Sequence, residues 1–316
     1  MFSNSGITIG NPNNDTNKDD YYYPVASQGA QYDYRGADGF STAPLFSSGS
    51  TYVHEYFDQT EEHNNKLRYH FPTSDVLHAS RSLVWLKPDI VVYYDRGISR
   101  SPGMFKRDSF NFTAMPVVTG QVAKVVDSVT KQGTFLTSLL PLPQDSAVTI
   151  CAYGSSVGDC AGGDVSKGGD ESAFLYQVSY KAPPLAADFL SVMEGADPGR
   201  PETPVSLVEA DGTPMDGAVV GNSIVLFTKT PWHAIRLFAP TSYAVPASVL
   251  NHYISGLQPD TMYGVEVREA GDKINVSVTK PCSANCLPTD NAGLLAFTAT
   301  AAGKVTTGSA PYKATR

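Results

Sequence analysis

The chain has 316 residues and a formal net charge of −8, with 27 glycines, 22 prolines and 17 tyrosines. Charged residues make up only 17%, a balance that fits a secreted β protein better than a helical cytosolic one. Because no basic block and no apolar run of about 20 residues occur, nucleic acid is a poor candidate partner and no membrane span is expected.

Residues 1–30 are polar and rich in Asn, Asp and Ser, which predicts a flexible N-terminal arm. Two apolar residues within this polar segment, Ile7 and Ile9, allow a more specific interpretation. In that interpretation a short strand of the arm pairs with a sheet edge of another subunit and produces a homo-oligomer. The first residues lack the charged and apolar regions of a signal peptide, so we expect a removed leader or a fragment of a longer protein.

Short segments rich in β-branched and aromatic residues follow from Tyr52 to Met193, and those at 105–112, 121–128 and 134–140 are bounded by Gly or Pro. In the segment 172–181, every second residue from Phe174 to Tyr180 is apolar or aromatic, which places these side chains on one face of a strand. No amphipathic helical stretch exceeds about ten residues. We therefore expect an all-β fold in which residues 31–197 form a large antiparallel β-sandwich.

The segment 78–96 predicts a tight antiparallel hairpin. Two β-type runs, Ser82–Leu86 and Ile90–Tyr94, flank a Lys-Pro-Asp turn in which the proline sets the bend. Arg81 and Asp95 are expected to form a structural ion pair across this hairpin.

The same hairpin resembles the C-terminal β-sandwich of heparinase II/III-like polysaccharide lyases. The resemblance is carried by the pattern R-S-L-x-x-L-x-P-D-x-V-V-x-x-D-R from Arg81 to Arg96, and it extends from about Tyr32 to Phe297. In full-length members an α/α toroid precedes the sandwich and carries most catalytic residues, typically Tyr, His and Asn. Because this chain has no such helical region, the resemblance implies the accessory β part without its catalytic partner.

A stretch rich in Gly and Pro near residues 195–204 precedes a smaller C-terminal β module, expected at 205–302 and followed by a loose tail at 303–316. Its pattern L-x-P-x-T-x-Y-x-V-x-V, from Leu257 to Val267, resembles the strand-turn-strand of fibronectin-type modules. In those modules a Leu and a Tyr pack around a Pro turn.

The cysteines form two local pairs, Cys151 with Cys160 and Cys282 with Cys286, which predicts two small-loop disulfides and an oxidising compartment. Zinc binding is the alternative, but it is disfavoured by the spacing and by the lack of a nearby His, so we expect no metal and no cofactor. Three glycosylation sequons support a surface location and occur at Asn14, Asn111 and Asn275.

Elimination chemistry on a uronate polysaccharide needs a base, a group that neutralises the carboxylate, and an acid for the leaving oxygen. Tyr and His suit the proton transfers and Arg suits the neutralisation. The candidates in the N-terminal half are Tyr34, Arg35, His54 and His78. The alternative is that such tyrosines only pack in strands, with their hydroxyls at the rim, and that the histidines lie on the surface.

Together these patterns predict an extracellular or cell-surface β-sandwich protein. The first interpretation is a non-catalytic glycoprotein subunit that self-assembles into a filament or surface layer through its arm. The first alternative is a carbohydrate-binding accessory domain of a polysaccharide lyase, which would bind polysaccharide and cleave nothing. The second alternative is an active uronate-polysaccharide lyase, against which the missing toroid argues.

Overall fold

The computed structural model describes residues 6–10, 46–49, 76–99, 102–103, 105–152, 174–210, 215–229, 241–258, 260–290 and 293–308. This part of the chain contains strands and turns but no helix, which confirms the predicted all-β class. None of it therefore includes a helix long and apolar enough to cross a membrane.

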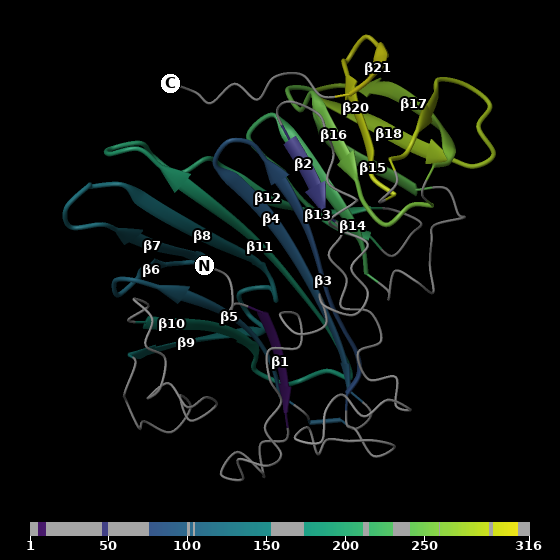
Figure 1. The fold of residues 1–316 in the computed structure, drawn as a ribbon. Helices are drawn as coiled ribbons and strands as arrows, with labels where there is room; N and C mark the ends of the chain where they lie inside the picture. The colour runs from purple at the N-terminus through teal and green to yellow at the C-terminus, as the bar shows by residue number, and fades with distance from the viewer. Residues whose placement is uncertain are drawn as a thin grey trace.

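The strands form four sheets, called A to D here (Figure 1). Sheet A contains, in spatial order, β1 (Gly6–Gly10), β5 (Phe105–Phe112), β10 (Phe174–Tyr180) and β9 (Ser146–Ala152). Sheet B contains β2 (Phe46–Gly49), β3 (Val76–Leu86), β4 (Ile90–Ser99), β11 (Ala186–Ala196), β8 (Gly133–Leu140), β7 (Val122–Val126) and β6 (Val117–Thr119). Sheet C contains β12 (Val205–Ala210), β13 (Met215–Val220), β14 (Ser223–Thr228), β16 (Asn251–Ile254), β20 (Leu295–Ala299) and β21 (Val305–Thr307). Sheet D contains β15 (Thr241–Pro246), β18 (Lys273–Thr279), β17 (Met262–Ala270) and β19 (Cys286–Pro288).

The four sheets stack as layers, because side chains alternate between the two faces of each strand. One hydrophobic cluster joins sheets A and B, a second joins B and C, and a third joins C and D. Tyr93 of β4 packs in the A–B cluster, whereas its neighbour Tyr94 packs in the B–C cluster. Strand β4 is consequently buried on both faces, and each such fully buried side chain contributes about 1.5–3 kcal/mol.

The predicted hairpin is present and longer than expected. Strands β3 and β4 pair antiparallel around the turn at residues 87–89, and β4 continues past Arg96 to Ser99. Arg81 stands directly opposite Asp95 in this register, and the ion pair between them stays a prediction.

The described pairings are antiparallel except for β14 and β16, which run parallel. Parallel neighbours need a crossover connection. Here the chain leaves sheet C after Thr228, contributes β15 to sheet D, and returns to sheet C at Asn251. The crossover links the two sheets of the C-terminal module.

The Leu and the Tyr of the fibronectin-like pattern pack in one core, whereas its proline, Pro259, lies outside the described residues. Leu257 and Tyr263 are both 2% exposed and pack in the C–D cluster. The backbone N–H of Gln258 donates to the Tyr263 hydroxyl at 3.1 Å. The tyrosine thus fills the core and satisfies a turn amide with the same side chain.

Sheets A and B contain β1–β11, and sheets C and D contain β12–β21. One hydrophobic cluster joins sheets B and C, and the division of the chain into two domains stays a prediction. Two strands lie in segments expected to be irregular: β1 falls inside the predicted arm, and β21 inside the predicted tail. Both pair with a strand of the same chain, β5 and β20 respectively, which gives their backbone groups hydrogen-bond partners.

Two polar side chains of β4 cross from sheet B to sheet C. The Tyr94 ring stacks on Phe227 at a centroid distance of 5.4 Å, and its hydroxyl donates to Asp216 Oδ2 at 3.0 Å. Arg96 donates from Nε to the Thr228 carbonyl at 2.6 Å. Burial raises the pKa of Tyr94 well above its ordinary value, so the phenol remains a proton donor.

Replacing Tyr94 with Phe keeps the stacked ring but removes the hydrogen bond to a buried carboxylate. We expect Tyr94→Phe to lower the free energy of unfolding by about 1–3 kcal/mol, measured by urea denaturation. The matched control is Tyr180→Phe, whose half-buried hydroxyl donates to the neutral Asp188 carbonyl at 2.8 Å. A larger loss in the control than in Tyr94→Phe would contradict the role of the buried charge.

A second buried polar group lies in the C–D module. His252 of β16 is fully buried, stacks on Phe297 at 4.8 Å, and shares a 2.9 Å hydrogen bond between Nδ1 and the Tyr243 hydroxyl. Burial lowers the pKa of His252 to about 3. The folded protein therefore holds a neutral imidazole where the unfolded chain, with a pKa near 6.5, takes up a proton.

This difference predicts a loss of stability in acid. The contribution of neutral His252 is complete above about pH 6.5 and declines as the pH falls toward 3, by up to about 1.4 kcal/mol per pH unit. His252→Gln keeps a polar side chain but does not titrate, so its unfolding free energy should fall less steeply between pH 6.5 and 4. Parallel pH profiles for the two proteins would show that His252 does not cause the decline.

Candidate functional site

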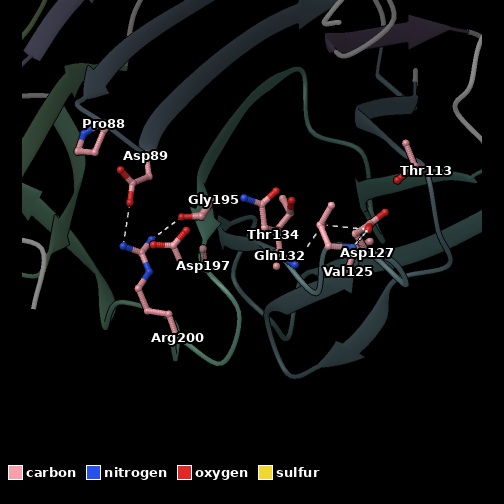
Figure 2. Close-up of a pocket in the computed structure, with 13 residues that line it drawn as sticks. Pro88, Asp89, Thr113, Val125, Asp127, Gln132, Thr134, Gly195, Asp197 and Arg200 are labelled. Carbon is pink, nitrogen blue, oxygen red and sulfur yellow. Dashed lines mark hydrogen bonds and ion pairs between the residues drawn. The ribbon is translucent and has the colours of Figure 1, made fainter. Parts of the chain in front are cut away.

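A pocket of about 850 Å³ opens at one end of sheet B (Figure 2). Because neighbouring strands are antiparallel, the β3–β4 turn, the β7–β8 turn and the end of β11 all lie at this end. The lining comes from these three places, namely residues 88–89, 125–134 and 195–200, with Thr113 added from the segment after β5.

Arg200 ties two of these segments together. Its Nη1 donates to Asp89 Oδ2 at 2.8 Å, and its Nη2 donates to Glu194 Oε1 at 2.9 Å and to the Gly195 carbonyl. Glu194 is nearly buried and also accepts 2.8 Å hydrogen bonds from the backbone N–H and the hydroxyl of Thr203. Figure 2 shows the guanidinium reaching from the β11–β12 connection to the hairpin turn.

Asp127 organises the β7–β8 turn on the other side of the pocket. Its Oδ1 accepts hydrogen bonds from the backbone of Val129 at 2.9 Å, and from the backbone and hydroxyl of Thr130 at 2.6 and 2.9 Å. The bonds from Thr130, followed by that from Val129, lower the pKa of this carboxyl. A carboxylate held in this way stabilises the turn in its ionised form.

The remaining lining offers neutral polar groups. Thr113, Gln132 and Thr134 supply hydroxyl and amide groups that both donate and accept hydrogen bonds. Trp85 lies next to the rim, because its indole N–H donates to the Pro88 carbonyl at 3.1 Å, and its ring is 38% exposed. Polar groups that donate and accept, beside an exposed aromatic ring, suit a polyhydroxylated ligand.

Of the four predicted catalytic candidates, the structure describes only His78, which is not among the described lining residues. Tyr34, Arg35 and His54 lie outside the described residues. His78 lies opposite Ile98, near the end of β3 that is remote from the pocket. Within the described ranges, no group of three or more His, Cys, Asp and Glu residues is placed to hold a metal ion.

One predicted disulfide is present, between Cys282 and Cys286, with Cα atoms 5.7 Å apart. Cys151 is also disulfide-bonded, while Cys160 lies outside the described residues. Among the sequons, Asn275 is exposed on β18, Asn111 is half-buried on β5, and Asn14 lies outside the described residues. Glycosylation at these positions stays a prediction.

The predicted assembly strand pairs within its own chain. Ile7 and Ile9 of β1 stand opposite Asp108 and Lys106 of β5, so one edge of β1 is used inside the protein. Pairing of the arm with another subunit stays a prediction.

Sequence reasoning did not identify the pocket. Asp127 and Thr134 belong to segments interpreted only as strands and turns, and Arg200 lies in the stretch interpreted as a domain boundary. The one part of the pocket that the sequence analysis singled out is Pro88-Asp89, the turn of the lyase-like pattern, which forms part of the pocket rim.

No protein-family model and no curated protein matches this chain. Solved structures with a similar fold include the heparan sulfate lyase HepC from Pedobacter heparinus, at 11% identity and a TM-score of 0.38, over 61% of this chain and 27% of that chain. Heparinase III is also similar, at 16% identity and a TM-score of 0.34, over 48% of this chain and 23% of that chain. This chain thus spans about a quarter of their length. The hairpin sequence resembles the same group of lyases, and at these TM-scores the likeness carries no argument about activity.

The ion pair at the pocket predicts a measurable loss of stability. Arg200→Ala leaves nearly buried Glu194 without its charged partner, so we expect the unfolding free energy to fall by about 1–3 kcal/mol. The matched control is Arg268→Ala, because Arg268 pairs with Glu266 at 3.1 Å with side chains 79% and 49% exposed. That exposed pair should contribute less than about 1 kcal/mol. Equal losses in chemical denaturation would show that Arg200 does not hold the pocket together.

Proposed function

We propose that this chain is an extracellular β-sandwich module that binds polysaccharide in the pocket beneath the β3–β4 turn and does not cleave it. The observation that carries the proposal is the pocket, whose rim is the Pro88-Asp89 turn of the lyase-like hairpin. The extracellular location is supported by the disulfide between Cys282 and Cys286, since such bonds persist in oxidising compartments.

The lining supports binding through hydroxyl groups. Thr113 follows β5, whereas Gln132 and Thr134 lie where the β7–β8 turn meets β8, so polar groups from two segments of the chain border the same space. Arg200 and Asp127 hold the surrounding turns, which prepares the pocket before a ligand arrives. A preformed pocket loses less conformational entropy on binding than a flexible one.

The same lining argues against cleavage at this place. Elimination needs a base such as Tyr or His, and the described lining residues include neither. Glycoside hydrolysis needs a carboxyl group with a raised pKa to act as the acid. The pKa of Asp127 is lowered instead.

Binding can be measured by affinity electrophoresis and calorimetry of the whole chain against a panel of soluble polysaccharides. Gln132→Ala removes one exposed amide from the pocket, and we expect affinity to fall about 2- to 10-fold, which corresponds to one neutral hydrogen bond. The matched control is Gln144→Ala, an exposed glutamine beyond the opposite end of β8, which should not change affinity.

The same mixtures test for cleavage through the ultraviolet absorbance of unsaturated uronate products and through new reducing ends. We expect neither signal. Release of either product by the wild-type chain would contradict the non-catalytic part of the proposal. Equal affinity losses in the two glutamine variants would contradict the assignment of the pocket.

A further inference from the structure

We infer that this pocket accepts neutral glycans and discriminates against uronate or sulfated ones. The inference rests on the proposed function and adds the class of ligand. The inference is based on the charges of the residues that line the pocket. Acidic side chains outnumber basic ones in the described lining, and its one arginine, Arg200, already pairs with Asp89 and Glu194.

Arg200 is the one cationic side chain among the described lining residues, and most of its N–H donors bond to groups of the protein. Nη1 and Nη2 are used by Asp89, Glu194 and the Gly195 carbonyl. The remaining Nε atom is buried without a hydrogen-bond partner, so a ligand in the pocket does not reach it. Three of the five N–H groups of Arg200 are thus used within the protein, and a carboxylate or sulfate would compete with these internal acceptors for the guanidinium.

Three aspartates, Asp89, Asp127 and Asp197, line the pocket with that one arginine, which makes the net charge of the lining −2. Only Asp89 is paired with the arginine. In Figure 2 the carboxylates of Asp127 and Asp197 lie on different sides of the lining. An anionic sugar entering between them meets like charge at short range, whereas a neutral sugar meets acceptors for its hydroxyl groups.

Two nearby lysines, Lys87 and Lys131, are not among the described lining residues. The Lys87 ammonium lies 5.0 Å from the centre of the exposed Trp85 ring, outside the lining. The Lys131 ammonium donates to the Ser128 carbonyl at 2.7 Å, within the β7–β8 turn. Both cations therefore lie outside the described lining, although the Lys131 charge acts on Asp127 and helps to lower the pKa of its carboxyl.

The decisive experiment compares polysaccharides that differ only in charge. Suitable pairs are fully methyl-esterified pectin with polygalacturonate, dextran with dextran sulfate, and hydroxyethyl cellulose with carboxymethyl cellulose. Calorimetry on the whole chain at low salt should show binding to the neutral member of at least one pair. The anionic member should bind at least about tenfold more weakly, with the difference shrinking as salt screens the charges.

A variant that lacks one lining charge tests whether the pocket causes the difference between neutral and anionic polysaccharides. Asp197→Asn removes one negative charge from the lining and should reduce the difference between the members of a pair at least about threefold. The matched control is Asp145→Asn, an exposed aspartate beyond the opposite end of β8, which should leave the difference unchanged.

The possible results distinguish a failure of the inference about charge from a failure of the proposed polysaccharide binding. Tighter binding of the anionic member in every pair that binds would overturn the inference about charge and leave polysaccharide binding intact. An equal effect of Asp197→Asn and Asp145→Asn would also overturn it. A chain that binds no member of any pair would overturn both the inference and the proposed function.

Discussion

The burial of β4 on both faces is the constraint on which the rest of the structure depends. Every residue from Val92 to Gly97 is buried, so this strand has no solvent-facing side for its polar side chains. Arg96 is only 2% exposed and donates to the Thr228 carbonyl and the Ser82 hydroxyl, with Asp188 close enough for their charges to interact, while Tyr94 bonds to Asp216. Because an unpaired buried polar group is costly, the packing of sheet C on sheet B has to bring Asp216 and the Thr228 carbonyl within hydrogen-bond distance of β4.

The position of the pocket follows from that arrangement. With β4 held between two layers, its hairpin turn projects from a fixed end of sheet B. Strand β11 pairs with β4 and ends beside the turn, where the Gly195 amide donates to the Asp89 carbonyl at 2.9 Å. Arg200 then closes the corner from the following segment. A binding site placed on such a rigid scaffold keeps its geometry although its residues belong to turns.

In this protein, the resemblance of the hairpin and the charge of the pocket point to different ligands. The hairpin pattern resembles lyases of uronate polysaccharides, but the lining presents three aspartates and an arginine that is already bonded. A shared β-sandwich does not determine what a pocket on it binds, because the ligand meets the side chains of the turns rather than the sheet. The proposed neutral ligand is therefore derived from the pocket, not from the likeness.

The features that could be predicted from the sequence depend on residues close together along the chain. These include the β3–β4 hairpin, the alternating face of β10, the Leu257–Tyr263 corner and the Cys282–Cys286 pair, all set by strand periodicity, turn chemistry and short spacing. The sequence pattern predicts the β4 strand, but not that a sheet covers each of its faces. Only the tertiary structure decided that coverage, and with it the pocket, because Asp89 and Arg200 are 111 positions apart. They meet through the pairing of β4 with β11 and the order of strands in sheet B, and no local pattern encodes that order.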